Sequence, residues 1–407
     1  MSIYDVNGNV VLDNKNCLPD EVVVAASDTP SQYKKIANYI CDGTNDEAEI
    51  QQAINDVNTI GYGTVRLLGG TYNIDSFKSY ANTVAERDTA LLIGANTTII
   101  NIKGSTGDRE TLLNVTSTAL SGVSQQVAVF ASAVKNTNTL NNYVANFSDL
   151  RINIADLNHP VIGIDNFYTG ASQISNIRIR QLGFGAGVMP ASGSVGIRCT
   201  NGNPNGIGQE MRHVGVTGFY EGFQMGGEHL VAIECLAHNC YYGYTFGNYN
   251  YTVGVMEHPL TLINCADELS ACLPLFAKCG AYNGTNHRGL QQVDMIGFTI
   301  ELRPTQNPTL AAVVPAEEIT PSSFCGTITF AANKLPFSTE NAVDVKFWKS
   351  GSGLNFNTTN AAHKLGGTTS ERNTYTPQYM QKYYDTDLNK LLIYNGTAWK
   401  DANGNSV

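Results

Sequence analysis

Three carboxylates in the middle of the chain have the chemistry needed to cleave a glycosidic bond. Glu221, Glu234 and Asp294 lie within a stretch of segments that repeat along the sequence. Glycosidases use two carboxyl groups, about 5 Å apart when the sugar configuration is retained and about 6.5–9.5 Å apart when it is inverted. Neighbouring strands of a sheet lie about 4.8 Å apart, so carboxylates one or two strands apart match these distances. These three residues are therefore the candidate catalytic groups.

Two of the carboxylates fall in one column when the repeats are aligned. Glu234 and Asp294 occupy the same position two repeats apart, with Asn264 between them and Arg212 one repeat earlier. Such a column would place an amide and a guanidinium beside an acid/base pair, where they could bind sugar hydroxyls. The alternative is a ladder of solvated polar side chains, since a shift of one residue moves the column to the other face.

Further candidates for substrate binding lie in the same stretch. His238 and Tyr242 stand among several tyrosines, whose rings can stack on sugar rings, although some tyrosines would instead fill the core. Arg303 near Asp267 could neutralise an acidic sugar for proton abstraction in a lyase. A surface ion pair explains the same two residues equally well.

The chain has no pattern typical of a metal or cofactor site. No calcium loop with alternating aspartates, zinc spacing or phosphate-binding loop occurs, and the run 42–46 is better placed to start a helix. The nine cysteines include no CxxC pair, so we interpret them as reduced and buried. We predict that the protein uses neither a metal ion nor a cofactor.

The repeats themselves indicate the architecture. Their spacing of 22 to 37 residues is typical of a solenoid, and the aligned segments start at Phe147, Ile174, Met211, Ile233, Ile263 and Val293. Each of the first three contains two alternating runs joined at a hinge, at Asp149, Asn176 and His213, where a left-handed bend is expected. Another strand follows after a loop. Three short strands per turn predict an all-β parallel β-helix over residues 41–335.

The ends of the chain differ from this centre. Residues 1–40 are predicted to form an N-terminal arm used for attachment or trimer contact. An amphipathic helix follows over 48–57, with Thr44 and Glu47 as its capping box. Residues 336–407 are predicted to be a linker and a small C-terminal β module, because a hairpin signal surrounds 387–389.

Residues 42–74 resemble the opening of β-helices of the pectate-lyase superfamily. The shared elements are Asp42-Gly43 with acidic residues after it, the amphipathic helix, Gly63-Thr64-Val65 and Gly70-Thr71-Tyr72. Tyr62 stands where the family has a glycine, and Leu68-Gly69 where it has a proline pair. The resemblance implies a right-handed β-helix whose helix covers the open N-terminal edge. It implies no particular chemistry, because lyases, hydrolases, epimerases and inert spikes share it.

Both ends of the chain are similar to phage tail proteins. Residues 2–9 are similar to openings of prophage tail proteins, and the segments 367–372, 384–390 and 394–399 are similar to small C-terminal modules of tail fibres and tail spikes. This resemblance implies a virion protein, made in the host cytoplasm, that forms a homotrimer and contacts other virion proteins. The implied ligand is a bacterial surface polysaccharide.

The composition limits the partners. The formal net charge of −10 argues against nucleic acid, and no apolar run is long enough to span a membrane. The low Lys and Arg content favours a neutral or mildly charged glycan over a polyuronate. Three hypotheses remain: a phage spike that binds and cleaves polysaccharide, a virion fibre without enzymatic activity, and a bacterial polysaccharide lyase or hydrolase.

Overall fold

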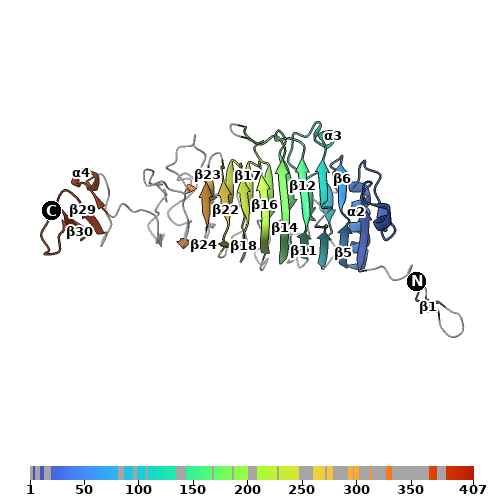
Figure 1. Ribbon diagram of the computed structural model, residues 1–407, viewed down its shortest axis with the longest axis horizontal. Coiled ribbons are helices and arrows are strands. Elements are labelled where there is room, and N and C mark those ends of the chain that lie inside the picture. The colour runs from blue at the N-terminus through green and yellow to red at the C-terminus, as the bar shows by residue number, and fades with distance from the viewer. Residues whose placement is uncertain are drawn as a thin grey trace, which may run out of the picture. The chain divides into compact units, whose positions relative to one another are not determined.

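The computed structural model describes residues 3–4, 10–12, 20–80, 87–94, 99–106, 109–133, 144–166, 169–185, 188–199, 209–226, 229–246, 260–270, 273–277, 292–296, 298–301, 312–313, 327–331, 366–373 and 382–407. The chain divides into two compact units, residues 1–359 and 360–407. Strands stacked in rungs make up the first unit (Figure 1). A separate four-stranded sheet with one parallel and two antiparallel pairings forms the second.

One side of the first unit is an eight-stranded, all-parallel sheet to which each rung contributes one strand. In order from the N-terminal end, its strands are β7 (Thr89–Ile93), β10 (Val127–Ser132), β13 (Val161–Asp165), β15 (Val195–Cys199), β17 (Glu221–Met225), β20 (Tyr242–Phe246), β23 (Leu273–Ala277) and β26 (Ala312–Val313). The second strands expected after each hinged pair are confirmed at β13, β15, β17 and β20.

The other side is a long sheet of 17 strands, in which most rungs contribute two strands or one long bent strand. Its N-terminal strands are β3 (Glu21–Ala25), β4 (Tyr39–Ile40), β5 (Tyr62–Leu67), β6 (Gly70–Ile74), β8 (Ile99–Lys103), β9 (Thr111–Val115), β11 (Val144–Ser148) and β12 (Leu150–Ile154). The later strands are β14 (Ser172–Gln181), β16 (Gln209–Thr217), β18 (Val231–Ile233), β19 (Leu236–His238), β21 (Leu260–Ile263), β22 (Ala266–Glu268), β24 (Gln292–Ile296), β25 (Thr299–Glu301) and β27 (Thr327–Ala331). The predicted right-handed parallel β-helix with three strands per turn is confirmed.

A column of left-handed residues bends the long sheet along its length. The backbone φ is 62° at Asp149, 53° at Asn176 and 53° at His213, which confirms the three predicted hinges. Glu234 and Asn264 continue the column, with φ of 52° and 51°. This conformation costs an L-residue about 1–2 kcal/mol and is adopted most readily by Asn and Asp. Side chains at the hinge stand on the outer face, where each is exposed or half-buried.

The core lies between the two sheets and consists of aliphatic residues that alternate with outward polar ones, as in β12. On the eight-stranded sheet, a column of glycines narrows the space between the two sheets. Gly163, Gly196 and Gly222 lie on adjacent strands, and a Cβ at any of them would meet a neighbouring carbonyl oxygen and a side chain across the core. The two sheets therefore approach closely at these three rungs.

The helix α2 (Glu47–Ile60) closes the N-terminal end of the solenoid, as expected (Figure 1). Its buried apolar stripe, which the amphipathic pattern of this segment indicates, consists of Ile50, Ala53, Ile54 and Val57. The rungs begin earlier than predicted, because β3 already pairs with β5 in the long sheet. The boundary expected at residue 40 is therefore wrong, since the solenoid includes residues from Glu21 onward.

The predicted capping box of α2 is also wrong. The Thr44 hydroxyl donates to Asp42 Oδ1 at 2.8 Å, and Glu47 instead accepts from the backbone N–H of Asp75 at 3.0 Å. Asp46 is the N-cap residue, and its carboxylate accepts from the N–H groups of Gly43 and Asn73 at 2.9 and 2.8 Å. Asp46 thus connects the start of α2 to the first rung, and no side chain caps the first turn of the helix.

The remaining elements of the first unit are short. They are the antiparallel pair β1 (Ile3–Tyr4) and β2 (Val10–Leu12), and the one-turn helices α1 (Ser31–Lys34) and α3 (Ser117–Leu120). Within the described residues, five cysteines are free and buried, as predicted: Cys41, Cys199, Cys235, Cys240 and Cys265. No helix among the described residues is long and apolar enough to cross a membrane.

The second unit confirms the predicted C-terminal β module. The expected hairpin is β29 (Lys382–Asp385) with β30 (Lys390–Tyr394), extended by β28 (Gly366–Gly367) and β31 (Trp399–Lys400). Tyr383, Leu392 and Trp399 form its core. The helix α4 (Thr369–Arg372) ends at an arginine whose guanidinium lies 3.0 Å from the buried carboxylate of Asp385.

Candidate functional site

A groove of about 550 Å³ runs over the outer face of the long sheet, across β12, β14, β16, β19 and β22. Charged and polar side chains dominate its lining, which includes Arg151, Asn153, Arg178, Arg180, Phe184, His213, Thr217, Glu234, His238 and Glu268. A second hollow of about 390 Å³ shares Arg151, Arg178 and His213 with it. From β12 to β22 the rungs make four steps, or about 19 Å at the spacing of a sheet.

The strand pairing brings three arginines together at one end of the groove. Arg151 of β12 is paired with Arg178 of β14, and Asn153 with Arg180, so all project from two adjacent rungs. Arg151 forms an ion pair with Glu110, and Arg180 Nε donates to Asn153 Oδ1 at 2.7 Å. The Arg178 side chain has neither a hydrogen bond nor an ion pair with any residue in the part of the chain that the structure describes.

A histidine and a glutamate form a dyad in the middle of the groove. His213 Nδ1 lies 2.8 Å from Glu234 Oε2, and both side chains are about half exposed, at 50% and 47%. They are neighbours because both occupy hinge positions of successive rungs. A neutral imidazole that donates from Nδ1 to the carboxylate keeps Nε2 as a proton acceptor. The arrangement is that of an oriented general base or acid.

The far end of the groove is acidic. One column of outward positions runs from Asn153 and Arg180 through Thr217 and His238 to Glu268. The His238 ring packs edge-on against Phe184, with centroids 5.8 Å apart. The groove therefore changes from basic to acidic along the helix axis.

Two predicted site residues lie in the groove, and two lie on the opposite sheet. Glu234 and His238 line the groove. Glu221 is only 6% exposed on β17, and its carboxylate accepts from Thr245 Oγ1 at 2.7 Å. Tyr242 is its neighbour on β20 and packs against the rings of Tyr220 and Tyr241. Glu221 is thus buried and hydrogen-bonded on the eight-stranded sheet and does not face the groove.

Three further predicted residues on the long sheet also lie outside the groove lining. Arg212 is exposed on β16 and contacts Glu210 at 3.0 Å. Asn264 is exposed at the hinge one rung beyond Glu234. Asp267 is 1% exposed at a core-facing position of β22, where it accepts from Ser270 Oγ.

The predicted column of Glu234 and Asp294 is wrong. Asp294 on β24 pairs with Thr261, and Thr261 pairs with Val231, which lies three residues before Glu234. The residues in the hinge column on either side of Glu234 are His213 and Asn264. Arg303, the last predicted binding residue, lies outside the described residues.

The sequence interpretation missed the arginines and the role of His213. The signal was present in the alternating run Ile177-Arg178-Ile179-Arg180, which places both arginines on the outer face of one strand. Arg151 occupies the same position one repeat earlier. His213 was recognised as a hinge, yet a hinge side chain points outward and is therefore available for chemistry.

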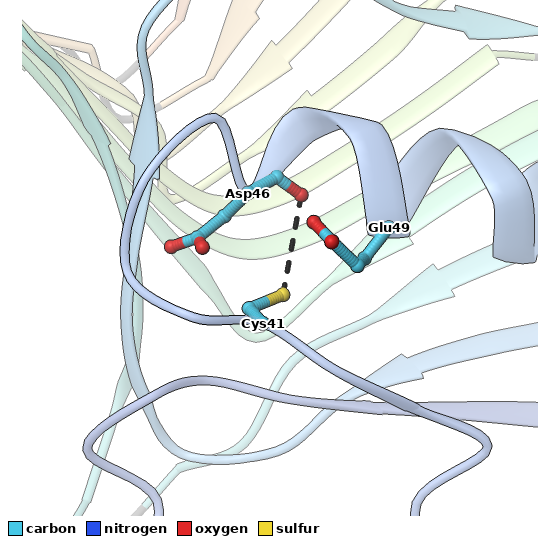
Figure 2. Close-up of side chains that lie close together, drawn as sticks. All are labelled: Cys41, Asp46 and Glu49. Atoms are coloured by element: carbon cyan, nitrogen blue, oxygen red, sulfur yellow. Dashed lines mark hydrogen bonds between the residues drawn. The ribbon is translucent and has the colours of Figure 1, made fainter.

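A separate cluster of potential metal ligands lies at the start of α2. Cys41, Asp46 and Glu49 place one ligand atom each within 4.8 Å of one another (Figure 2). Both Asp46 oxygens already accept backbone N–H groups, and the Cys41 thiol donates weakly to the Asp46 carbonyl oxygen at 4.0 Å. Burial raises the pKa of this thiol, which favours its protonated form. The positive end of a helix also disfavours a cation. The cluster therefore fits the attachment of the helix start to the first rung better than metal binding.

No protein-family model matches the chain, and no curated protein matches it. Solved structures with similarity include the tailspike protein of E. coli bacteriophage HK620, at 11% identity and a TM-score of 0.40, covering 82% of this chain and 56% of that one. Tailspike protein 3 of bacteriophage CBA120 matches at 11% identity and a TM-score of 0.27, covering 88% and 67%. The A-module of the Azotobacter vinelandii mannuronan C-5 epimerase AlgE4 matches at 12% and 0.31, covering 76% and 95%. The chain thus spans little more than half the length of the HK620 tailspike.

Proposed function

We propose that this chain is a phage tail-spike or tail-fibre protein that binds a bacterial surface polysaccharide. The observation that carries the proposal is the groove across successive rungs of the long sheet. It is long enough for several sugar units, and its polar side chains recur at the period of the strands. A polymer lying along the helix axis would meet a new set of hydrogen-bonding groups at each rung.

The ends of the chain support a virion role. Residues 2–9 and the C-terminal module resemble parts of phage tail proteins, and the module forms a compact unit of its own. A homotrimer attached to other virion proteins, assembled in the host cytoplasm, belongs to the same proposal. Light scattering of the purified chain would test its trimeric state.

Binding is tested with purified surface polysaccharides and whole cells of candidate hosts. We expect saturable binding to at least one host glycan, which substitutions in the groove abolish. Arg212→Gln is the matched control, since Arg212 is an exposed arginine of the same sheet outside the groove. Absence of binding to all host glycans and cells would refute the proposal.

Depolymerisation is a second candidate function, favoured by the dyad of His213 and Glu234. We propose that this pair supplies the acid/base group, in place of the buried Glu221 and of Asp294. Proton transfer by a positioned side chain contributes about 10²–10⁴-fold to a rate. Glu234→Gln should therefore slow cleavage about 100-fold or more while binding is retained.

The products distinguish the reaction classes. New reducing ends alone would indicate a hydrolase, and unsaturated uronates, detected by their ultraviolet absorbance, would indicate a lyase. Binding without either product would leave a receptor-binding fibre without enzymatic activity. Cleavage by a chain that associates with no phage particle would favour the bacterial enzyme.

A further inference from the structure

The arginine end of the groove carries an inference that rests on the proposed function and narrows its ligand. We propose that the groove selects a carboxylated polysaccharide, with the acidic sugar bound at Arg151, Arg178 and Arg180 and an uncharged unit toward Glu268. The composition of the whole chain favoured a neutral glycan, but the distribution of charge along the groove favours an acidic one.

The first argument is the proximity of like charges. Arg151 and Arg178 are directly paired residues of parallel strands, so their side chains leave the sheet about 4.8 Å apart. Like charges in this position destabilise a sheet. Arg180 adds a third guanidinium on the same strand and face. An anion bound between them would remove the repulsion.

The second argument is which of the three arginines is already paired. Glu110 neutralises Arg151, and Arg180 is held by the neutral amide of Asn153. Arg178 has no partner among the described residues, and it lines both hollows where they meet. Its guanidinium therefore retains its donors for a ligand, and the planar fork of these donors matches a carboxylate.

The third argument is the opposite charge at the other end. Glu234 of the dyad and Glu268 beyond it line the groove and would repel a second carboxylate there. Carboxylates suit sugar hydroxyls, which donate hydrogen bonds to them. Three strand steps separate β14, which carries Arg178 and Arg180, from β22, which carries Glu268, a distance of about 14 Å. The arginines and Glu268 would therefore contact different sugars of the polymer. The expected ligand is a heteropolymer that carries one acidic sugar per repeat.

The test compares each host polysaccharide that binds with the same polymer after chemical reduction of its carboxyl groups to alcohols. We expect reduction to weaken binding at least tenfold, and the affinity of the native polymer to fall as salt is raised. Arg178→Gln should weaken binding of the native polymer at least tenfold, equal to about 1.4 kcal/mol, whereas Arg212→Gln should leave it within about twofold. Arg178 is exposed, so its replacement should leave the melting temperature unchanged.

The outcomes separate the two proposals. Equal binding of native and reduced polymer, or binding of uncharged glycans only, would overturn this inference and leave the proposed function standing. The same holds if Arg178→Gln binds the native polymer as wild type does. If carboxyl reduction leaves binding unchanged and removal of phosphodiesters from the polymer abolishes it, the bound anion is a phosphate. That result would overturn the proposal of a carboxylated ligand. If no glycan binds, the proposed function and this inference both fail.

Discussion

The column of glycines in the eight-stranded sheet leads to a stability prediction for Gly196→Ala. A Cβ at Gly196 would lie 2.5 Å from the carbonyl oxygen of Gly222 and 2.7 Å from Cγ1 of Val216. Both distances are below the normal contact of carbon with these atoms, so the strand or its neighbour must shift. Overpacking of this kind costs about 1–3 kcal/mol, and we expect the upper half of that range because one contact is with backbone.

The matched control is Gly215→Ala on the opposite sheet. A Cβ there would meet only Arg178 Cγ, at 3.9 Å, which is an ordinary contact. Where the backbone permits it, Gly to Ala stabilises by about 0.4–1 kcal/mol through the unfolded chain. The same chemical change should therefore have opposite signs at the two sites.

Urea unfolding followed by circular dichroism measures both effects. A loss of about 2–3 kcal/mol at Gly196 corresponds to a melting temperature lower by roughly 3–5 °C, because the roughly 310 residues from β3 to β27 unfold with an entropy of about 2.1 cal/mol/K each. Equal stability of Gly196→Ala and wild type would refute the close approach of the two sheets. Equal destabilisation at Gly215 would show that loss of glycine itself, and not the contact, is responsible.

Three other predictions concern the N-terminal cap and the buried charges. Asp46→Ala should lower the free energy of unfolding in urea by about 1–2 kcal/mol, because two backbone N–H groups lose their acceptor. Thr44→Ala should change it by less than about 0.5 kcal/mol. A larger loss at Thr44 than at Asp46 would instead support a capping box formed by Thr44. Asp165→Ala should cost about 3–5 kcal/mol, since it removes the shared acceptor of two largely buried arginines, and a loss below 1 kcal/mol would contradict this ion-pair network. Burial and the hydrogen bond to Asp56 raise the pKa of Tyr39 to about 12. The raised pKa favours the neutral phenol, so the stability of wild type over Tyr39→Phe should be complete below pH 10 and disappear as the pH rises toward 12; a difference independent of pH would refute it.

The early rungs were predictable from sequence because large aliphatic residues mark only their core-facing positions. Phe147, Ile174 and Met211 are indeed aligned by the pairing of β11, β14 and β16. The order of strands and the hinges follow from that alignment. The C-terminal hairpin was equally visible, since its turn residues separate two short apolar runs.

The register failed where the outer face also becomes apolar. The core-facing partner of Met211 is Ala232, whereas Ile233 pairs with the exposed Arg212. Aligning the repeats by their largest apolar residue selects Ile233 instead of Ala232. This shifts the predicted register of the strand by one residue, which exchanges its core-facing and outward-facing side chains. The same error repeats at Ile263. Asp294 was misplaced by a separate and larger shift, because Ile263 pairs with Ile296 and not with Val293. Burial decides such cases, and it depends on residues far away in the sequence.

The positions of the candidate site residues could be predicted only where local alternation determines them. His238 was singled out for its residue type among several tyrosines, and the structure places it in the groove lining. Asp267 was misplaced because a carboxylate is not expected at a core position. The dyad required both the hinge geometry and the correct register, so no single segment contained the signal.

The left-handed hinge positions share one backbone conformation, while their side chains differ from rung to rung. The backbone shape of each hinge is set by the bend of its rung, while its side chain faces outward and contacts hinge side chains of adjacent rungs. Asn176 Nδ2 donates to Asp149 Oδ1 at 3.1 Å, and His213 pairs with Glu234. Asp, Asn, His and Glu all occupy the column in this one chain. Under the proposed function, a substitution at one hinge would therefore change the groups offered to a ligand at that rung and at its neighbour, while the bend of the backbone is kept.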